Sequence, residues 1–274
     1  MPELAEVEFY KKRWDVGIND TVDSVFVHKN AQVFRRCQAA KVAKILKARK
    51  LIASQCHGKQ MLFSFSGGVW LAIHLGMTGK LFCVDKEFSY SQGRHDHLVL
   101  KQKKRFLIFQ DPRCFGAVKV GDDGSIPKWW HNLPSEILSD AFKKPMLHKW
   151  AVRHGRLAVK ALWLKQDYFP GIGNWMADEI LWRAKIHPAR KAASLTVEEL
   201  DLLWRVTREV SRDALRVIGK DWSDPPEHWL FQHRWRDGGR CPIDNTALIR
   251  IEVGGRTSCY CPTCQPEHNQ LELI

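Results

Sequence analysis

The chain has 274 residues, of which 45% are hydrophobic, enough for two domains with cores of their own and too many for a disordered polypeptide. Lysine and arginine number 43 against 30 acidic residues, so the net charge is +13 and a polyanion is the expected partner. No apolar run approaches the roughly 18 residues that a membrane span needs, and the first residues show no signal-peptide pattern. The sequence therefore predicts a cytoplasmic protein with no membrane partner.

The first residues, Met1-Pro2-Glu3, bring candidate chemistry together. Removal of Met1 would leave Pro2 with a secondary amine, part of which is unprotonated at neutral pH. A secondary amine that attacks a sugar carbon forms a cationic iminium directly, and an iminium is an electron sink. Glu3 and Glu6 supply carboxylates that could assist the opening of a sugar ring. The alternative is that these acids only stabilise the first turn of a helix, which we predict over residues 3–15.

Short β-rich runs at regular spacing follow this helix and predict an antiparallel sandwich. The tight-turn sequence at 66–69, Ser-Gly-Gly-Val, predicts a hairpin between two of the strands. The strands are expected at 22–27, 53–56, 60–65, 69–73, 80–84, 97–101, 106–110 and 117–120. We therefore predict a β-sandwich domain over residues 1–130.

Helical patterns replace the strands after Pro127. Thr196 and Glu199 form a capping-box sequence at the start of the longest helix. The helices are expected over 135–142, 146–153, 157–166, 175–184 and 197–217. They predict a helical domain at 131–224, followed by an irregular segment at 225–240 within a third unit at 225–274.

Four of the eight cysteines lie near the end of the chain. Cys241-Pro-Ile-Asp244 and Cys261-Pro-Thr-Cys264 begin alike and bracket sixteen residues, which include a strand-like run at 248–253 and a Gly-Gly turn. This spacing indicates a zinc β-hairpin, with Asp244 in the position where four-cysteine sites have a thiolate. The predicted ligands are Cys241, Asp244, Cys261 and Cys264. Cys259 is an alternative fourth ligand, and a hairpin without metal is a third possibility.

Four further motifs contain glycine. Pro-Gly-Ile-Gly-Asn at 170–174 precedes a predicted helix, whose first amide groups suit a phosphate; Asn174 could bind the same ligand or only cap the helix. Gly58-Lys59 lies between two predicted strands. The segments 74–79 and 111–116 lie at strand ends, and their Met77 and Phe115 are residue types usually found in cores, whereas Arg113 is not.

Taken together, these motifs resemble the formamidopyrimidine-DNA glycosylase family, from Pro2 to Gln265. The shared motifs follow the family order: Met-Pro-Glu-Leu-x-Glu-Val-Glu, Gly-Lys, His-Leu-Gly-Met-x-Gly, Asp-Pro-Arg-x-Phe-Gly, Gly-Ile-Gly-Asn-x-x-x-Asp-Glu, and Gly-Gly-Arg before the last Cys-Pro-x-Cys. Leu4, Met77, Arg113 and Phe115 resemble the formamidopyrimidine branch more than the endonuclease VIII branch. The resemblance implies an α+β fold, a β-sandwich with an N-terminal helix joined to a helix-two-turn-helix domain that ends in a zinc hairpin.

The resemblance also implies an activity, that of a bifunctional DNA glycosylase and abasic-site lyase of base excision repair. The expected substrates are oxidised purines, such as formamidopyrimidines and 8-oxoguanine, in double-stranded DNA, or an abasic site, bound by a monomer. Pro2 would attack C1′, Glu3 would protonate the ribose oxygen, and Lys59 would hold a phosphate and assist proton transfer before β- and δ-elimination. Such an enzyme turns the damaged base out of the stack.

The resemblance implies a set of DNA-binding residues as well. An apolar wedge and an arginine would fill the space that the base leaves, and other residues would hold phosphates. The set comprises Glu6, His74, Met77, Arg113, Phe115, Lys160, Asn174 and Arg256.

The sequence departs from the family pattern at several positions. Ala5 replaces a proline, Lys165 an aspartate and Asp244 a cysteine. The stretch 218–231 lacks the Gly-Gly-Ser/Thr-rich loop that covers a flipped oxidised purine and contains Pro225-Pro226 instead. An enzyme for a different lesion and a catalytically weak damage-binding protein are therefore alternatives. A pure binder would not need Pro2, Glu3 and Lys59 together, which argues against the second alternative.

Overall fold

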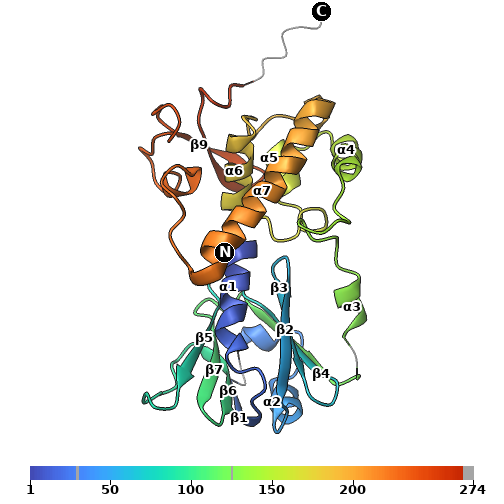
Figure 1. Cartoon of the computed structure of the whole chain (residues 1–274), viewed down its shortest axis with the longest axis vertical. Helices are drawn as coiled ribbons and strands as arrows, with labels where there is room; N and C mark the ends of the chain where they lie inside the picture. The colour runs from blue at the N-terminus through green and yellow to red at the C-terminus, as the bar shows by residue number, and fades with distance from the viewer. Residues whose placement is uncertain (29–30, 125, 268–274) are drawn as a thin grey trace, which may run out of the picture. The chain divides into compact units, whose positions relative to one another are not determined.

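The computed structural model describes residues 1–28, 31–124 and 126–267. Two compact units make up the chain, residues 1–133 and 134–274 (Figure 1). The domain limits expected at 130 and 224 stay predictions. Across the described residues, no helix has the length and apolar character that crossing a membrane requires.

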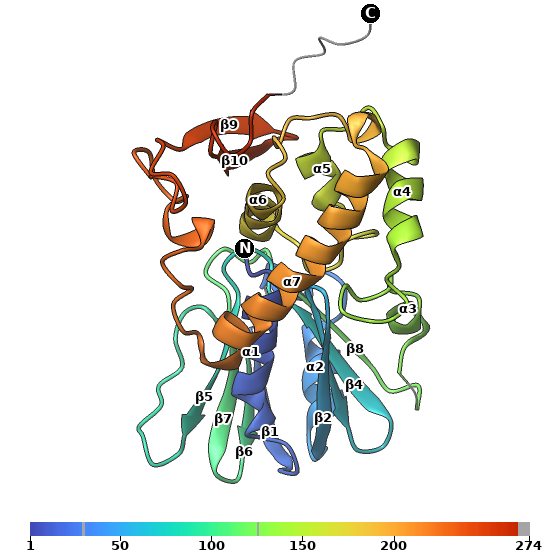
Figure 2. The same ribbon diagram turned by 45° about the horizontal axis from the view of Figure 1, so that its top comes forward.

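The first unit contains two antiparallel sheets of four strands each (Figure 2). One has the order β1 (Val22–Val27), β6 (Asp96–Gln102), β7 (Arg105–Gln110), β5 (Lys80–Asp85), and the other β2 (Leu51–His57), β3 (Gln60–Phe65), β4 (Val69–His74), β8 (Ala117–Gly121). All eight predicted strands are therefore present, and the predicted sandwich is confirmed. The tight turn expected at 66–69 joins β3 to β4, with Gly67 and Gly68 both at positive φ.

Two helices close the sides of this sandwich. α1 (Leu4–Asp15) contacts the edge strands β5 and β2, and α2 (Ala39–Leu46) contacts the edge strands β1 and β8. Covering an edge keeps its unpaired backbone groups from pairing with another chain. The sequence analysis missed α2, although its buried Ala39, Val42 and Leu46 follow helical spacing, and it missed two short turns of helix, η1 (Gln32–Phe34) and α3 (Lys128–His131).

The second unit is helical and ends in a hairpin. Its helices are α4 (Lys144–Arg153), α5 (Val159–Trp163), α6 (Asn174–Arg183) and α7 (Val197–Asp221), with short 3₁₀ turns η2 (Ala192–Ser194) and η3 (Leu230–Gln232). The capping box is confirmed, because Thr196 N donates to Glu199 Oε2 at 2.8 Å and Glu199 N donates to Thr196 Oγ1 at 3.2 Å. β9 (Ile249–Val253) and β10 (Arg256–Tyr260) form the hairpin, closed by two glycines at positive φ.

The helix predicted over 135–142 is wrong, because these residues form turns. Arg208 of α7 supplies the physical reason. Its guanidinium donates to the carbonyl oxygens of Ile137 and Ser139, each at 2.8 Å, and of Leu138 at 3.1 Å. In a helix these carbonyls would accept backbone amides four residues on. A side chain distant in sequence satisfies them instead.

The helix predicted over 157–166 is shorter than expected and forms only α5. Gln166 stabilises the turns that replace its second half. The side-chain amide donates to the carbonyls of Leu164 at 3.0 Å and Ile172 at 2.8 Å, and its oxygen accepts from Gly171 N at 3.2 Å. These bonds fix the glycine-containing loop that leads into α6.

Candidate DNA-binding residues and metal cluster

The start of α1 holds the candidate nucleophile and acid. The amide N of Glu3 donates to Glu6 Oε2 at 3.1 Å, and both side chains are buried. Glu6 therefore satisfies one of the backbone amides that a helix start leaves without an intrahelical partner. This bond gives Glu6 a capping role and fixes the backbone of Glu3 directly after the half-buried Pro2.

Lys59 lies at the tip of the β2–β3 hairpin. His57 pairs with Gln60 in the sheet, so Gly58 and Lys59 form a two-residue loop. Gly58 has φ +56°, as the first central residue of a type II′ turn requires. Lys59 therefore lies in a two-residue hairpin turn, the shortest common connection between antiparallel strands.

Asp111 joins the two loops that carry the candidate wedge residues. Its carboxylate is fully buried. One oxygen accepts a hydrogen bond from Thr78 Oγ1 at 2.6 Å, and the other accepts one from Gly116 N at 2.7 Å. Thr78 Oγ1 in turn accepts from Arg113 N at 3.3 Å. Asp111 belongs to the motif at 111–116, but the sequence did not indicate this positioning role.

Gly76 lets the same two loops touch. It has φ +64°, and a Cβ at this position would lie 2.4 Å from the carbonyl carbon of Phe115, so only glycine fits. The Arg113 guanidinium lies 4.7 Å from the centre of the Phe115 ring, and both side chains are exposed. The loop with Met77 is therefore fixed against the loop with Arg113 and Phe115.

His74 is a neutral donor at physiological pH. Burial, and then the charges of Lys59, Arg36 and Arg35, lower the pKa of its imidazole to about 4. Nδ1 accepts from Gly76 N at 3.0 Å, which assigns the proton of the neutral ring to Nε2. His74 can therefore donate a hydrogen bond to an acceptor without carrying a charge.

In the second unit, three predicted phosphate-binding residues meet at one end of β10. Lys160 Nζ donates to the carbonyl oxygen of Thr257 at 3.0 Å, and Asn174 Nδ2 donates to the same oxygen at 2.9 Å. Thr257 follows Arg256, whose side chain is exposed. Lys160 is fully buried and also bonded to Asp178, so in this structure Lys160 and Asn174 position the strand that presents Arg256. Their direct contact with a phosphate stays a prediction.

Asp178 is the central acceptor of this arrangement. One oxygen accepts from Lys160 and from Ser258 Oγ at 2.8 Å; the other accepts from Cys259 N at 3.1 Å and from the guanidinium of Arg234. Its side chain is fully buried. Sequence reasoning missed Asp178 as a site residue. The available signal was its position four residues after Asn174, which places both on one face of α6.

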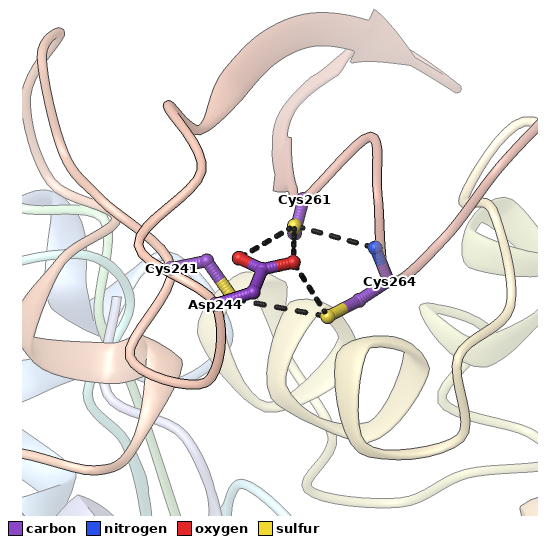
Figure 3. Close-up of side chains that lie close together, drawn as sticks. All are labelled: Cys241, Asp244, Cys261 and Cys264. Carbon is purple, nitrogen blue, oxygen red and sulfur yellow. Dashed lines mark hydrogen bonds between the residues drawn. The ribbon is translucent and has the colours of Figure 1, made fainter.

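The four predicted metal ligands form one cluster (Figure 3). Their ligand atoms all lie within 4.8 Å of one another. Cys241 Sγ lies 3.8 Å from Cys264 Sγ, and Asp244 Oδ2 lies 3.5 Å from Cys261 Sγ and 3.4 Å from Cys264 Sγ. Tetrahedral zinc with bonds of about 2.3 Å to sulfur and about 2.1 Å to oxygen would separate two sulfurs by about 3.8 Å and sulfur from oxygen by about 3.6 Å. The donor atoms therefore fit zinc.

Cys259 is not a member of this cluster. Burial, and then the nearby carboxylate of Asp178, raise the pKa of its thiol to about 11. The backbone amide of Cys259 is bonded to Asp178. Both observations place Cys259 with the buried carboxylate rather than with the metal cluster.

Family models match most of the chain. The model described as the formamidopyrimidine-DNA glycosylase N-terminal domain matches residues 1–118, and the model described as the H2TH domain of the same enzymes matches residues 133–224. The chain belongs to the formamidopyrimidine-DNA glycosylase family. The resemblance stated from the motifs is thus confirmed.

Curated relatives agree with this assignment over their full length. The formamidopyrimidine-DNA glycosylase of Thermus thermophilus is 36% identical over 281 residues, covering 97% of this chain and 99% of the relative. That of Halorhodospira halophila is 32% identical, covering 97% and 100%. This chain is therefore a DNA glycosylase, like its relatives in the family.

Solved structures share the fold. The Lactococcus lactis formamidopyrimidine-DNA glycosylase bound non-covalently to DNA with an abasic site has a TM-score of 0.85 and 24% identity, covering 97% of this chain and 100% of that one. The same protein in complex with DNA containing FAPY-dG has a TM-score of 0.85 and 22% identity, with the same coverage. The predicted α+β architecture is confirmed.

Proposed function

We propose that this chain is a bifunctional DNA glycosylase and abasic-site lyase that acts on damaged bases in double-stranded DNA. The observation that carries the proposal is the start of α1, where Pro2 directly precedes the buried Glu3, in a chain of this family. The net charge of +13 suits a DNA partner. The Lactococcus lactis relative, bound to DNA with an abasic site or FAPY-dG, supports the same class of ligand.

The chemistry follows from a free amine on Pro2. The nitrogen lone pair attacks C1′, the glycosidic bond breaks, and the base leaves with its electron pair and takes up the proton that the alkylated Pro2 nitrogen releases. Glu3 donates a proton to the ribose ring oxygen, so the sugar opens and a Pro2 iminium forms. Loss of a C2′ proton expels the 3′ phosphate, loss of a C4′ proton later expels the 5′ phosphate, and water then releases Pro2. Lys59 holds a phosphate and assists the proton transfers.

The lesion preference depends on the segment after α7. The helix continues through Gly219 to Asp221, and Trp222, with φ +64°, ends it. Pro225 and Pro226 then fix φ at two further positions. Such a segment lacks the freedom of a glycine-rich cover, so it forms fewer bonds to the edge of a flipped purine. We therefore expect discrimination to favour formamidopyrimidines over intact 8-oxoguanine.

Borohydride reduction tests the activity and the lesion together. The protein is mixed with matched duplexes that contain an abasic site, a formamidopyrimidine or 8-oxoguanine, and the adducts are mapped by mass spectrometry. We expect DNA on residue 2, rapid trapping on the abasic duplex, and faster single-turnover excision of formamidopyrimidine than of 8-oxoguanine. DNA attached to Lys59 would refute the assignment of Pro2 as nucleophile. The absence of an adduct on every duplex would favour the alternative that the chain is a damage-binding protein. Equal excision rates would refute only the lesion preference.

We also propose that the C-terminal cluster binds one zinc ion through Cys241, Asp244, Cys261 and Cys264. Bound zinc would supply a structural cross-link between the two knuckles of the hairpin and no catalytic step. The cross-link would fix the position of Arg256, because Arg256 lies at the opposite end of β10 from Cys261. The mutual distances of the four donor atoms, all within 4.8 Å, support this ligand set.

Metal analysis of two variants tests the ligand set. Asp244→Ala is expected to lower bound zinc well below one ion per chain, because it removes one of four donors. Cys259→Ser is the matched control and is expected to keep the full ion, since its thiol lies outside the cluster. The reverse result, zinc retained without Asp244 and lost without Cys259, would assign the fourth ligand to Cys259.

A further inference from the structure

The outer face of the sheet β2-β3-β4-β8 carries a group of polar side chains with two alanines among them. Gln60 pairs with His74, His74 with Ala117, and Ala72 with Lys119, so these residues occupy the same face of neighbouring strands. The opposite face supplies core residues such as Ile73 and Val118. Two alanines between longer polar side chains leave space on a face that bulkier residues would fill.

That space is a cavity of about 210 Å³. Its lining combines two alanines and one aromatic ring with five side chains that donate hydrogen bonds, and it contains no acidic residue. The lining residues are Arg35, Arg36, Gln60, Ala72, His74, Phe115, Ala117 and Lys119. At about 30 Å³ for each water in the liquid, the volume accommodates a phosphate group together with a few waters.

The cations of the cavity differ in what they already bind. The guanidinium of Arg35 donates to the carbonyls of Phe115 at 3.2 Å and of Gly116, so it holds the wedge loop in place. Lys119 Nζ lies 4.4 Å from the centre of the Trp129 ring, which orients it without neutralising it. The side chain of Arg36 is exposed at the rim.

The electrostatics favour an anion in this cavity. Burial and the charge of Arg36 lower the pKa of Lys119, and burial and nearby cations lower that of His74. Positive charges held close together without a carboxylate repel one another, and a bound anion relieves that repulsion. The Nε2 hydrogen of His74 and the amide of Gln60 add neutral donors.

We infer that this cavity binds one phosphodiester of the DNA, held by Arg36, Lys119 and His74. The inference rests on the proposed function for its ligand, because DNA is the source of the phosphate. Phe115 lines the cavity, so the phosphate lies beside the proposed wedge and close to the lesion. Lys119 and Arg36 are thus two DNA-contacting residues that no motif in the sequence indicated.

The salt dependence of binding tests this site. The double variant Arg36→Gln, Lys119→Gln is compared with the intact chain on a duplex containing a stable abasic-site analogue. Loss of one phosphate contact should flatten the log-log salt slope by about 0.9 and weaken binding about eightfold at 0.1 M salt, with the difference vanishing towards 1 M. The double variant Lys103→Gln, Lys104→Gln, which changes two exposed lysines in the β6–β7 turn, is the matched control for the loss of two charges and should leave the slope unchanged.

Neutral methylphosphonates placed one at a time along both strands identify the phosphate. One position close to the lesion should weaken binding to the intact chain and have no further effect on the double variant. An unchanged salt slope, or the absence of any position with this coupling, would overturn the inference. Borohydride trapping on Pro2 remains a separate measurement, so this site can fail while the proposed activity holds. Thermal unfolding of the double variant checks that its fold is intact.

Discussion

Replacing Asp178 by asparagine is expected to lower the free energy of unfolding of the second unit by about 3–5 kcal/mol. The carboxylate is fully buried and bonded to two cations, Lys160 and Arg234, that are themselves buried. Asparagine keeps the shape but removes the charge, so both cations would remain in the interior without compensation. Urea unfolding, followed by the fluorescence of the tryptophans, measures the loss.

Asp201→Asn is the matched control for this prediction. Asp201 of α7 also pairs with a lysine, Lys144, at 2.9 Å, but both side chains are partly exposed to solvent. Exposed ion pairs are screened by water and contribute little, so a far smaller change is expected. A loss in the Asp178→Asn variant as small as the loss in the Asp201→Asn variant would show that the buried carboxylate contributes no more than an exposed ion pair and does not hold the hairpin.

The second large effect concerns the amine of Pro2. A Gly-Ser extension placed before Pro2 converts this amine into an amide, which has no lone pair available for attack. Cleavage of an abasic duplex should fall by about 10³-fold or more, because the covalent step is removed. Gel analysis of single-turnover reactions gives the rate, and titration of the same duplex gives the affinity.

The affinity separates lost chemistry from lost folding. Binding should change only a few-fold, because the wedge loops and Arg256 lie elsewhere in the chain. The same extension placed after the last residue is the control and should leave the cleavage rate unchanged. Full cleavage by the protein extended before Pro2 would rule out the amine as nucleophile.

Much of the fold could be predicted because it follows local rules. Every second residue of a strand faces the sandwich core, as Leu71 and Ile73 do in β4, and the capping box at Thr196 depends on residues three apart. The helix prediction for residues 135–142 failed because Arg208, which is distant in sequence, donates hydrogen bonds to carbonyl oxygens of this segment. α2 was missed although its pattern was present.

Some residues of the candidate site could likewise be predicted from local motifs, and others could not. Lys59 and the metal ligands belong to short motifs whose spacing is visible in the sequence, and the structure brings the four ligands together. Asp111 and Asp178 also accept hydrogen bonds from residues distant in sequence, namely Thr78, 33 residues from Asp111, and Cys259, 81 residues from Asp178. The spacing of Asp178 from Asn174 placed both on one face of α6, but it did not indicate that the carboxylate accepts hydrogen bonds from several segments at once. The cavity that Lys119 lines likewise combines residues of three strands and two loop segments that come together only in the folded unit.

The closure of the sandwich by α1 has a consequence for the proposed reaction at Pro2, which lies just before the helix begins. Chain ends are normally disordered, and a nucleophile on such an end would lose conformational entropy in every catalytic cycle. Trp14 packs 4.9 Å from Phe63 of one sheet and donates to the Ile108 carbonyl of the other, so α1 is anchored in the core. The ordering of the helix that follows Pro2 is therefore completed when the unit folds, and the proposed nucleophile, the nitrogen of Pro2, would start each turnover with much of its translational freedom already removed.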